Sequence, residues 1–395
     1  MKKTFFSFLV LLSTLNAEVL SDAFKNGYTK IKLETFFYDI DKEKKSEDAH
    51  ATAVGGYLAY TTDTTQAFYG SLKFHTSNPI FSSKNITKTA LFNNDKNAEA
   101  LHAISESFIA YKTPTRVMKL GNMILKTPMM NEDTTRIVPW SYQGFAYSGS
   151  ATKHTQVQLY YINAIRNHTS DEYTKESASG SIGSKGLTML SFFYKNTHQL
   201  NAQAFYYYVP DLYSTFFTQL NYPLKYQDSL LFCFGVQYFN SHNGGKYNKR
   251  EDENGGDDID LLAAKISIDA DDWGASLNYS QNFGLSGIVK GYGGLSKVYT
   301  TSMVANGRGN YKPETWMLKL DYNLPLNAAE SDLALWLTHT KVHDSRGESF
   351  KAYYFHYRHF FNKDTSMYLR YENINYDKVT SNDVAYFRFI CSYEF

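Results

Sequence analysis

The chain ends on VAYFRFICSYEF (residues 384–395), in which aromatic side chains recur at alternate positions. A period of two is the period of a β-strand, whose successive side chains point to opposite faces. The aromatic positions Phe387, Phe389, Tyr393 and Phe395 share one face, while Tyr386, Arg388, Ser392 and Glu394 share the other. Chain ends are commonly frayed and polar, so a terminal strand this apolar needs partners. The stretch predicts a strand that pairs along its edges and presents one face to an apolar medium.

Composition favours a large β architecture. The 395 residues suffice for two or three soluble domains or one large β-domain. Basic and acidic residues nearly cancel at 40 and 39, so bulk charge does not indicate nucleic-acid binding. Aromatic residues make up 16%, with 33 Tyr and 28 Phe, types that favour strands and membrane interfaces. The mean hydropathy of −0.43 does not exclude a membrane barrel, because lumen-facing polar residues offset lipid-facing apolar ones.

The N-terminus has the three parts of a secretory signal peptide. A basic MKK precedes the apolar FFSFLVLLSTL, and LNA stands before Glu18. The apolar run is about half of the ~20 residues that a spanning helix needs, and no later segment offers ~18 consecutive apolar residues. We expect residues 1–17 to be a cleaved signal peptide and residues 18–395 to be one exported domain.

The rest of the chain is organised with a period of two. TKIKLETFFY (29–38), TWMLKLDYNL (315–324) and FKAYYFHYRHFF (350–361) each alternate over about ten residues, the length of a tilted membrane-crossing strand. Strands are predicted at 28–40, 51–62, 66–76, 103–112, 116–127, 144–152, 154–165, 187–196, 199–209, 214–225, 230–240, 259–269, 273–283, 315–324, 332–342, 350–361, 365–376 and 384–395.

The connections between these eighteen strands alternate in length along the chain. Odd-numbered connections are often long and polar, such as DKEKKSEDAH, whereas even-numbered ones are short, such as TDTT, TPT and NKD. This alternation is typical of an up-and-down transmembrane barrel with long external loops and tight periplasmic turns. An open sheet edge in hydrocarbon leaves backbone groups unpaired, so the first and last strands must pair. The fold class predicted is therefore all-β: a closed antiparallel barrel of about 18 strands.

A barrel of this width is not filled by its own side chains, so it holds water, a plug or inward loops. A plug is not expected, because no separate globular segment precedes the first strand. By length and composition, the third and seventh long loops are instead expected to fold inward. The alternation also predicts lumen-facing cations, with Arg on the last three strands. We call the predicted set the basic ladder: Arg388, Arg370, Arg358, His356, Lys319, Lys265, Lys119 and Lys73. Such a series lets an anion pass from site to site.

A resemblance supports these expectations. LGNMILKTPMMNEDTTRIVPWSYQGF (120–145) resembles the G-x-x-x-x-x-T-P…D-x-R-x-x-P…G segment of the OprD family of substrate-specific outer-membrane porins. The matching positions are Gly121, Thr127, Pro128, Asp133, Arg136, Pro139 and Gly144, with Asp133 and Arg136 one residue further apart than usual. GYGG (291–294), YTTSM (299–303) and the last strand are similar to the family more weakly.

The resemblance implies an eighteen-stranded barrel with a constriction at loops three and seven and a basic ladder on its wall. It also implies passive passage of small carboxylate-bearing nutrients, including amino acids, small peptides and organic acids. In loop three, Asp133 and Arg136 are expected to pair and so fix the loop, with direct contact to the solute as the alternative role, and Pro128 and Pro139 are expected to stiffen the backbone. No cofactor or metal is expected.

Other functions remain as alternatives. An enzyme would need a catalytic constellation, but HExxH and GxSxG are absent from the sequence, and His154, His168, His198 and His242 are expected to be solvated. A general, weakly selective porin (a major outer-membrane protein) with an adhesion role is the nearest competitor. A fatty-acid channel would need a plug and an apolar pathway. Loop six, KREDENGGDDID, lacks regular calcium-ligand spacing.

Expected partners are small anionic or zwitterionic solutes, outer-membrane lipid and lipopolysaccharide, and not nucleic acid. Phe395 resembles the C-terminal signature recognised by barrel-assembly machinery. The oligomeric state is left open between a monomer and a homotrimer. Cys233 and Cys391 have no motif spacing and are expected to be buried or lipid-facing, without a disulfide.

Overall fold

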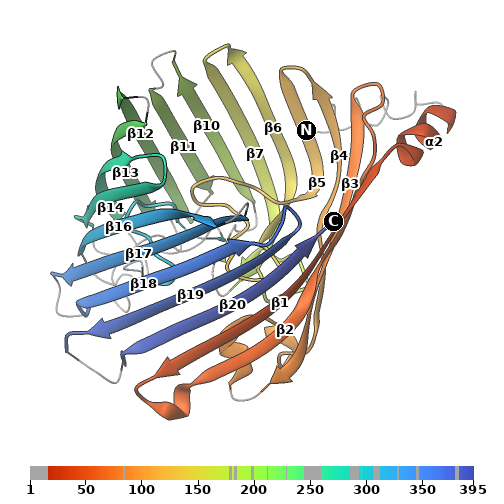
Figure 1. Ribbon diagram of the computed structural model, residues 1–395. Helices are drawn as coiled ribbons and strands as arrows, with labels where there is room; N and C mark the ends of the chain where they lie inside the picture. The colour runs from red at the N-terminus through yellow and green to blue at the C-terminus, as the bar shows by residue number, and fades with distance from the viewer. Residues whose placement is uncertain are drawn as a thin grey trace.

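The computed structural model describes residues 17–82, 85–177, 180–181, 185–196, 200–210, 212–227, 229–243, 259–284, 293–294, 296–305, 312–326, 329–343, 347–378 and 382–395. Eighteen antiparallel strands form one sheet that curls into a barrel (Figure 1). The strands are β1 (Tyr28–Lys42), β2 (Ala49–Thr61), β3 (Phe68–Ser82), β4 (Leu101–Thr113), β5 (Arg116–Met123), β6 (Ser141–Thr152), β7 (Thr155–Arg166), β10 (Leu187–Lys195), β11 (Asn201–Val209), β12 (Tyr213–Gln227), β13 (Leu230–Asn243), β14 (Ile259–Asp269), β15 (Trp273–Asn282), β16 (Pro313–Leu326), β17 (Ala329–Val342), β18 (Phe350–Phe360), β19 (Thr365–Tyr376) and β20 (Val384–Glu394).

The predicted fold class is confirmed, and each predicted strand overlaps one of these eighteen. The largest boundary differences are at β3, which continues six residues beyond its predicted end to Ser82, and at β5, which ends four residues early at Met123 because the chain there leaves the wall for loop 3. Several short features were not predicted: the helix α2 (Ala17–Lys25), a two-stranded ribbon of β8 (Glu176–Ser177) and β9 (Gly180–Ser181), and the 3-10 helices η1 (Lys45–Glu47), η2 (Ile86–Thr89) and η3 (Asn94–Lys96). Of the helices in the described part of the chain, none has the length and apolar character to span a bilayer.

The last strand closes the barrel. β20 pairs with β19 on one edge and with β1 on the other. The seam continues to the final residue, because Phe395 and Ile31 exchange backbone hydrogen bonds of 2.8 and 2.9 Å. Every backbone group along the seam therefore has a partner on the neighbouring strand, as a strand in hydrocarbon requires.

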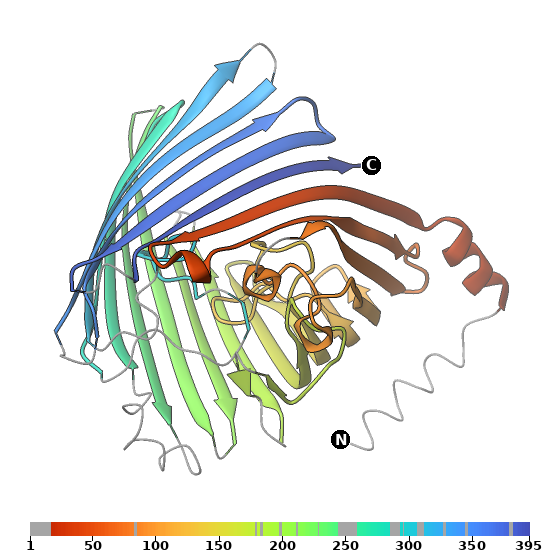
Figure 2. The ribbon, with the colours of Figure 1, turned by 90° about the horizontal axis from the view of Figure 1, so that it is seen from below.

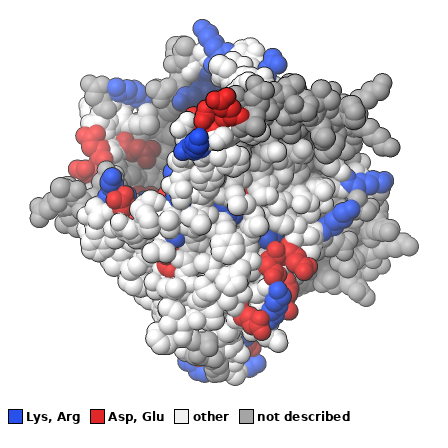
Figure 3. Space-filling model, turned by 90° about the vertical axis from the view of Figure 1, so that its right-hand side faces the viewer, with Lys and Arg blue, Asp and Glu red and all other residues white. Residues whose placement is uncertain are grey.

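The two faces of the wall differ as the sequence period predicts. On β1, Phe36 and Tyr38 face inward and are 1% and 2% exposed, whereas outward-facing Leu33 is 57% exposed. Most of the described surface seen in Figure 3 is uncharged, with Lys, Arg, Asp and Glu side chains gathered in small groups. The many exposed large hydrophobic side chains of the outer face match a barrel whose outer solvent is lipid.

Long connections lie at one end of the barrel and short turns at the other. Loop 3 (residues 124–140) and the described part of loop 7 (residues 283–284, 293–294, 296–305 and 312) fold into the ring of strands rather than away from it. Figure 2 shows loop 3 inside the barrel. The lumen is therefore subdivided by these loops.

Candidate functional site

All eight residues of the basic ladder lie on inward-facing positions of their strands. Lys73 and Lys119 are on β3 and β5, on one side of the lumen. The other six follow one another along β14 and β16 to β20: Lys265, Lys319, His356, Arg358, Arg370 and Arg388. Their surroundings differ sharply, so the ladder is not a uniform series of free cations.

Arg388 is the most enclosed of these cations. Its side chain is only 2% exposed, and its Nη2 donates to the Tyr38 hydroxyl at 3.0 Å while the guanidinium lies 4.4 Å from the Tyr38 ring centre. Arg136 of loop 3 stacks on the same ring at 4.9 Å. Among the residues that the structure describes, none gives a hydrogen-bond partner to the buried Nε and Nη1 atoms of Arg388 or to the buried Nε of Arg136. Both arginines line a cavity of about 560 Å³.

Arg370 stands directly opposite Arg388 in the β19–β20 pair. Its Nε donates to the Tyr354 hydroxyl at 3.0 Å, and its guanidinium lies over the rings of Tyr354 and Tyr368. Like charges directly opposite in a sheet destabilise the pair. Packing alone therefore gives no reason for two arginines here, whereas an anion between the loops and this wall would offset their repulsion.

Arg358 and His356 have a carboxylate partner that the sequence reasoning missed. Asp332 on β17 accepts from Arg358 Nε at 2.7 Å and lies 2.9 Å from His356 Nε2. Strand pairing brings Asp332 opposite Arg358. Its inward position follows from the same alternation, so it was within reach of the sequence. Asp332 therefore offsets part of the positive charge of Arg358.

Lys265, Lys319 and Arg370 line a second cavity of about 450 Å³ behind loop 7. Lys319 Nζ is 4.3 Å from the Trp336 ring centre and Lys265 Nζ is 5.5 Å from that of Tyr299. Asp269 and Asp321 line the same cavity and oppose its positive charge.

Lys73 and Lys119 belong to a different environment. They line a cavity of about 480 Å³ together with Glu106 of β4 and Glu132 of loop 3. Each lysine lies over an aromatic ring, Lys73 at 3.8 Å from Tyr57 and Lys119 at 4.3 Å from Phe108. Charges of both signs therefore meet here.

Loop 3 is held by backbone contacts at its prolines. The Pro128 carbonyl accepts from the backbone N–H of Lys297 in loop 7 at 3.1 Å. The Pro139 carbonyl accepts from Nη2 of the fully buried Arg166 at 2.8 Å. The two prolines therefore mark the points where loop 3 is attached to its neighbours.

The predicted pairing of Asp133 with Arg136 is wrong: no ion pair joins the two side chains in the described part of the chain. Asp133 instead accepts from the hydroxyl and N–H of Thr135 at 2.6 and 3.2 Å, and Arg136 turns back to Thr135 O and to the Tyr38 ring. Burial opposes ionisation of Asp133, but His168, Thr135 and Arg136 together hold its pKa below the ordinary value. Burial and the charge of Arg388 lower the pKa of Arg136 to about 10, so it remains a cation at neutral pH.

The expected solvation of His168 is also wrong. Its side chain is 19% exposed and packs edge-on against Trp140 with ring centres 5.5 Å apart. Burial and the nearby Arg136 lower the pKa of His168 to about 4, which leaves it neutral at pH 7. His154 lies at a short turn and hydrogen-bonds the Lys195 carbonyl, while His198 and most of loop six lie outside the described residues.

Loop 7 packs closely on loop 3. Gly293 and Gly294 both have φ of +79°, and a Cβ on Gly293 would lie 2.4 Å from the Trp140 ring. At Gly294 the nearest atom would be Asn131 Oδ1 at 2.4 Å. Both positions therefore need glycine for conformation and for space. The packing therefore explains the last two glycines of the GYGG segment (291–294). Gly291 and Tyr292 lie outside the described residues.

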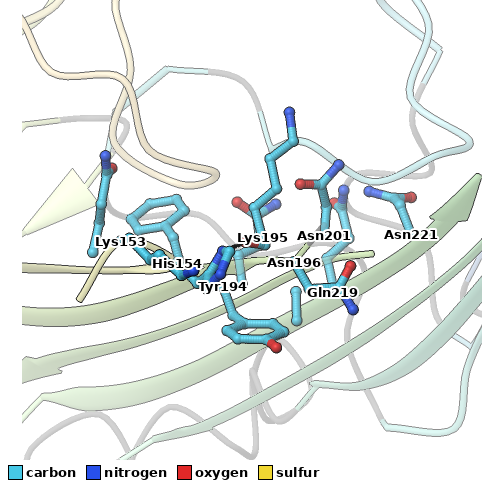
Figure 4. A pocket seen from close by; sticks show the side chains of 12 residues that line it. Lys153, His154, Tyr194, Lys195, Asn196, Asn201, Gln219 and Asn221 are labelled. Carbon is cyan, nitrogen blue, oxygen red and sulfur yellow. Dashed lines mark hydrogen bonds between the residues drawn. The ribbon is translucent and has the colours of Figure 1, made fainter. Parts of the chain in front are cut away.

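A further cavity, of about 650 Å³, opens near the short-turn end of β7 and β10 to β12. Its lining combines Lys153 and Lys195 with amides such as Asn201, Gln219 and Asn221. Figure 4 shows Lys195 and the outward-facing Tyr194 pointing to opposite sides of the same strand. It was not predicted, although the amides recur at alternate positions.

Both cysteines are free. Cys391 lies on the outer face of β20, as expected. Cys233 is neither fully buried nor lipid-facing: it stands opposite Ser267, which lines the cavity behind loop 7.

Comparisons with known proteins agree with this geometry. The model of the family described as "outer membrane porin, OprD family" matches residues 29–329. The fold is similar to OccAB2 of Acinetobacter baumannii (TM-score 0.81, 16% identity, 95% of this chain and 99% of that chain). It is also similar to OccK9 (OpdG) of Pseudomonas aeruginosa (0.80, 14%, 94% and 99%) and to OpdK of P. aeruginosa crystallised with vanillate (0.78, 14%, 94% and 99%). No curated protein sequence matches significantly.

The matching family and the similar structures are porins, which are channels rather than enzymes. The match covers well over half of the chain and agrees with the closed eighteen-stranded barrel. The chain therefore belongs to the OprD family of outer-membrane porins and is a barrel of the Gram-negative outer membrane.

Proposed function

We propose that this porin passes small carboxylate-bearing nutrients, namely amino acids, small peptides and organic acids, by passive diffusion. The solute crosses a constriction between loops 3 and 7 and is held weakly by the basic ladder. The observation that carries the proposal is the pair of the buried Arg388 and the partly buried Arg136, which line one cavity beside both loops. In the described part of the chain, Nε and Nη1 of Arg388 and Nε of Arg136 are buried and have no hydrogen-bond partner. Guanidinium nitrogens bind carboxylates in a forked geometry, and a cavity that supplies them unpaired is suited to such an anion.

The proposed class of solute rests on the side chains around the cations and not on the ligands of similar structures. Aromatic rings flank the cations, with Tyr38 between Arg136 and Arg388 and Trp336 beside Lys319. This combination suits a carboxylate carried on a flat or apolar body. OpdK was crystallised with vanillate, an aromatic carboxylate, but its low identity to this chain extends the likeness to the fold alone.

Planar-bilayer recordings test the proposal. Under a salt gradient, we expect a reversal potential that indicates anion preference, and we expect benzoate or an amino-acid carboxylate to reduce the current by competing for the arginines. Strong cation preference that benzoate leaves unchanged would overturn the proposal. It would favour the alternative, a general weakly selective porin with an adhesion role, which the carboxylates Asp332, Asp321 and Asp269 beside the ladder also suit.

The processing and assembly of the chain are proposed from the sequence. Residues 1–17 act as the signal peptide and residues 18–395 form the barrel, so N-terminal sequencing of the mature protein is expected to begin at Glu18. Phe395 is recognised by the barrel-assembly machinery, and its deletion is expected to slow assembly. Lipid and lipopolysaccharide surround the barrel, and cross-linking in membranes distinguishes a monomer from a homotrimer.

A further inference from the structure

Loop 7 is tied across the lumen, and we infer that Glu372 is the positioning residue that holds it there and so sets the width of the pore. The inference rests on the proposed channel function. We call residues 296–305 the loop-7 strap. Glu372 on β19 is completely buried, and its Oε2 accepts from the backbone N–H of Val304 at 2.6 Å and of Ala305 at 3.4 Å. Its Oε1 has no hydrogen-bond partner among the residues that the structure describes.

The other end of the strap is attached to a distant part of the wall. Gln237 of β13 donates from Nε2 to the Lys297 carbonyl at 2.9 Å and accepts from the Tyr299 N–H at 3.0 Å. The Tyr299 hydroxyl donates to Asn221 of β12 at 2.7 Å. The strap therefore runs from β12 and β13 to β19, strands that are far apart around the barrel.

The strap separates two cavities, and Glu372 lies at the boundary. Met303, Val304 and Ala305 line the cavity that contains Arg388 and Arg136. Loop-7 residues between Ser296 and Ser302 line the cavity that contains Arg370, Lys265 and Lys319. If the strap left the wall, these two spaces would merge into one wider passage.

A carboxylate is the natural anchor at this position. Two backbone N–H groups converge on one charged oxygen, an arrangement stronger than neutral hydrogen bonds. Glu372 is also placed two residues from Arg370 on the same face, and Tyr386, its cross-strand partner, is two residues from Arg388. Its negative charge therefore moderates the arginine pair in addition to holding the strap.

Three variants separate anchoring from charge. Glu372→Ala removes both, while Glu372→Gln removes the charge but keeps an oxygen that can accept from Val304 and Ala305. Glu106→Ala is the matched control, because Glu106 is an inward-facing carboxylate on β4 that lines the cavity of Lys73 and Lys119 rather than either cavity beside the strap. If Glu372→Ala gives no folded barrel, Glu372→Asp retracts the carboxylate by one methylene and serves in its place.

Hydrogen–deuterium exchange of peptides containing Val304 and Ala305 tests the anchor independently of transport. Loss of hydrogen bonds to a charged group is expected to speed exchange there about tenfold or more in Glu372→Ala, with much less change in Glu372→Gln and none in Glu106→Ala. Unchanged exchange in Glu372→Ala overturns the inference, whether or not the protein conducts.

Single-channel recording tests the consequence for the pore. We expect Glu372→Ala to show larger, noisier conductance with weaker discrimination between solutes, and Glu372→Gln to keep the native conductance but to prefer anions more strongly. Faster exchange with unaltered conductance and selectivity would show that the strap is anchored by Glu372 but does not set the pore width, which also overturns the inference. A protein that conducts no ions at all would contradict the proposed function while leaving the exchange result intact.

Discussion

Two stretches of the inner wall are built from the same kind of strand pairing but carry different chemistry. The arginine wall, on β19, β20 and β1, places Arg370, Arg388 and Tyr38 side by side. The glutamine wall, on β11 to β13, places Gln203, Gln219 and Gln237 side by side in one row. In the described part of the chain, the arginine wall has cations that repel each other and guanidinium nitrogens without a hydrogen-bond partner, whereas Gln237 and Gln219 hydrogen-bond each other at 2.7 Å. From this comparison we propose that the arginine wall serves the solute and the glutamine wall serves the loops.

The largest effect is expected from removing the arginine pair. Arg370→Gln with Arg388→Gln removes one half-buried and one buried cation from neighbouring positions, and the anion-to-cation permeability ratio is expected to fall roughly tenfold. Reversal potentials in planar bilayers measure this ratio. Gln156→Ala with Gln203→Ala is the control, because neither glutamine makes a side-chain hydrogen bond in the described part of the chain, and it is expected to leave the ratio unchanged. Equal effects of both double variants would contradict the division of roles between the walls.

A smaller effect is expected within the glutamine wall. Gln237→Ala removes the two hydrogen bonds to the strap and the bond to Gln219. Hydrogen exchange at Tyr299 is expected to rise several-fold, since each bond contributes about 1 kcal/mol. Charge selectivity is expected to change little. If Gln203→Ala, which touches no part of the strap, gave the same rise, the role assigned to Gln237 would be wrong.

Within the basic ladder, Arg358, which pairs with Asp332, is expected to contribute less to anion preference than Arg370 and Arg388. Arg358→Gln removes a cation that Asp332 already neutralises at 2.7 Å, so anion preference is expected to fall by less than about twofold. Asp332→Asn is expected to shift the reversal potential the opposite way, because it frees Arg358 and leaves its charge uncompensated. A large loss from Arg358→Gln alone would show that Asp332 does not weaken this rung.

The smallest effect concerns pH, through His168, which follows β7, and Asp133 of loop 3, because both line the cavity of Arg136 and Arg388. The pKa of His168 is lowered to about 4 from its ordinary value near 6.5, so the folded loops favour the neutral ring. Their stability is therefore full above about pH 6.5 and is lost as the pH falls towards 4. Asp133, whose pKa is also lowered, adds a further loss at still lower pH. We expect current fluctuations to increase from pH 6.5 to 4 and to remain flat in His168→Phe; identical profiles would remove His168 from the account.

Sequence periodicity was sufficient for the strands because a membrane strand has one apolar and one polar face throughout its length. It fails where a bulge or a contact between loops intervenes. The ladder residues followed from alternation. Two further inward residues could have been found in the same way: Glu372 shares a face of β19 with Arg370, and Asp332 stands opposite Arg358. The roles of Arg136 and His168 were not open to it, since the residues they contact, Tyr38 and Trp140, lie about a hundred and about thirty positions away.

The sequence by itself determined the barrel. Strand number, closure through VAYFRFICSYEF and the direction of each inner cation all follow from the period of two and from the need of every backbone group for a partner in hydrocarbon. The tertiary structure decided which cations are free. Asp332 reaches Arg358 through strand pairing, whereas Arg136 joins Arg388 at Tyr38 and Glu372 holds the strap only because loops 3 and 7 fold back inside. The alternation along a strand determines whether a side chain points into the lumen or towards lipid. Its partner inside the lumen depends on the path of loops 3 and 7, whose sequences do not alternate.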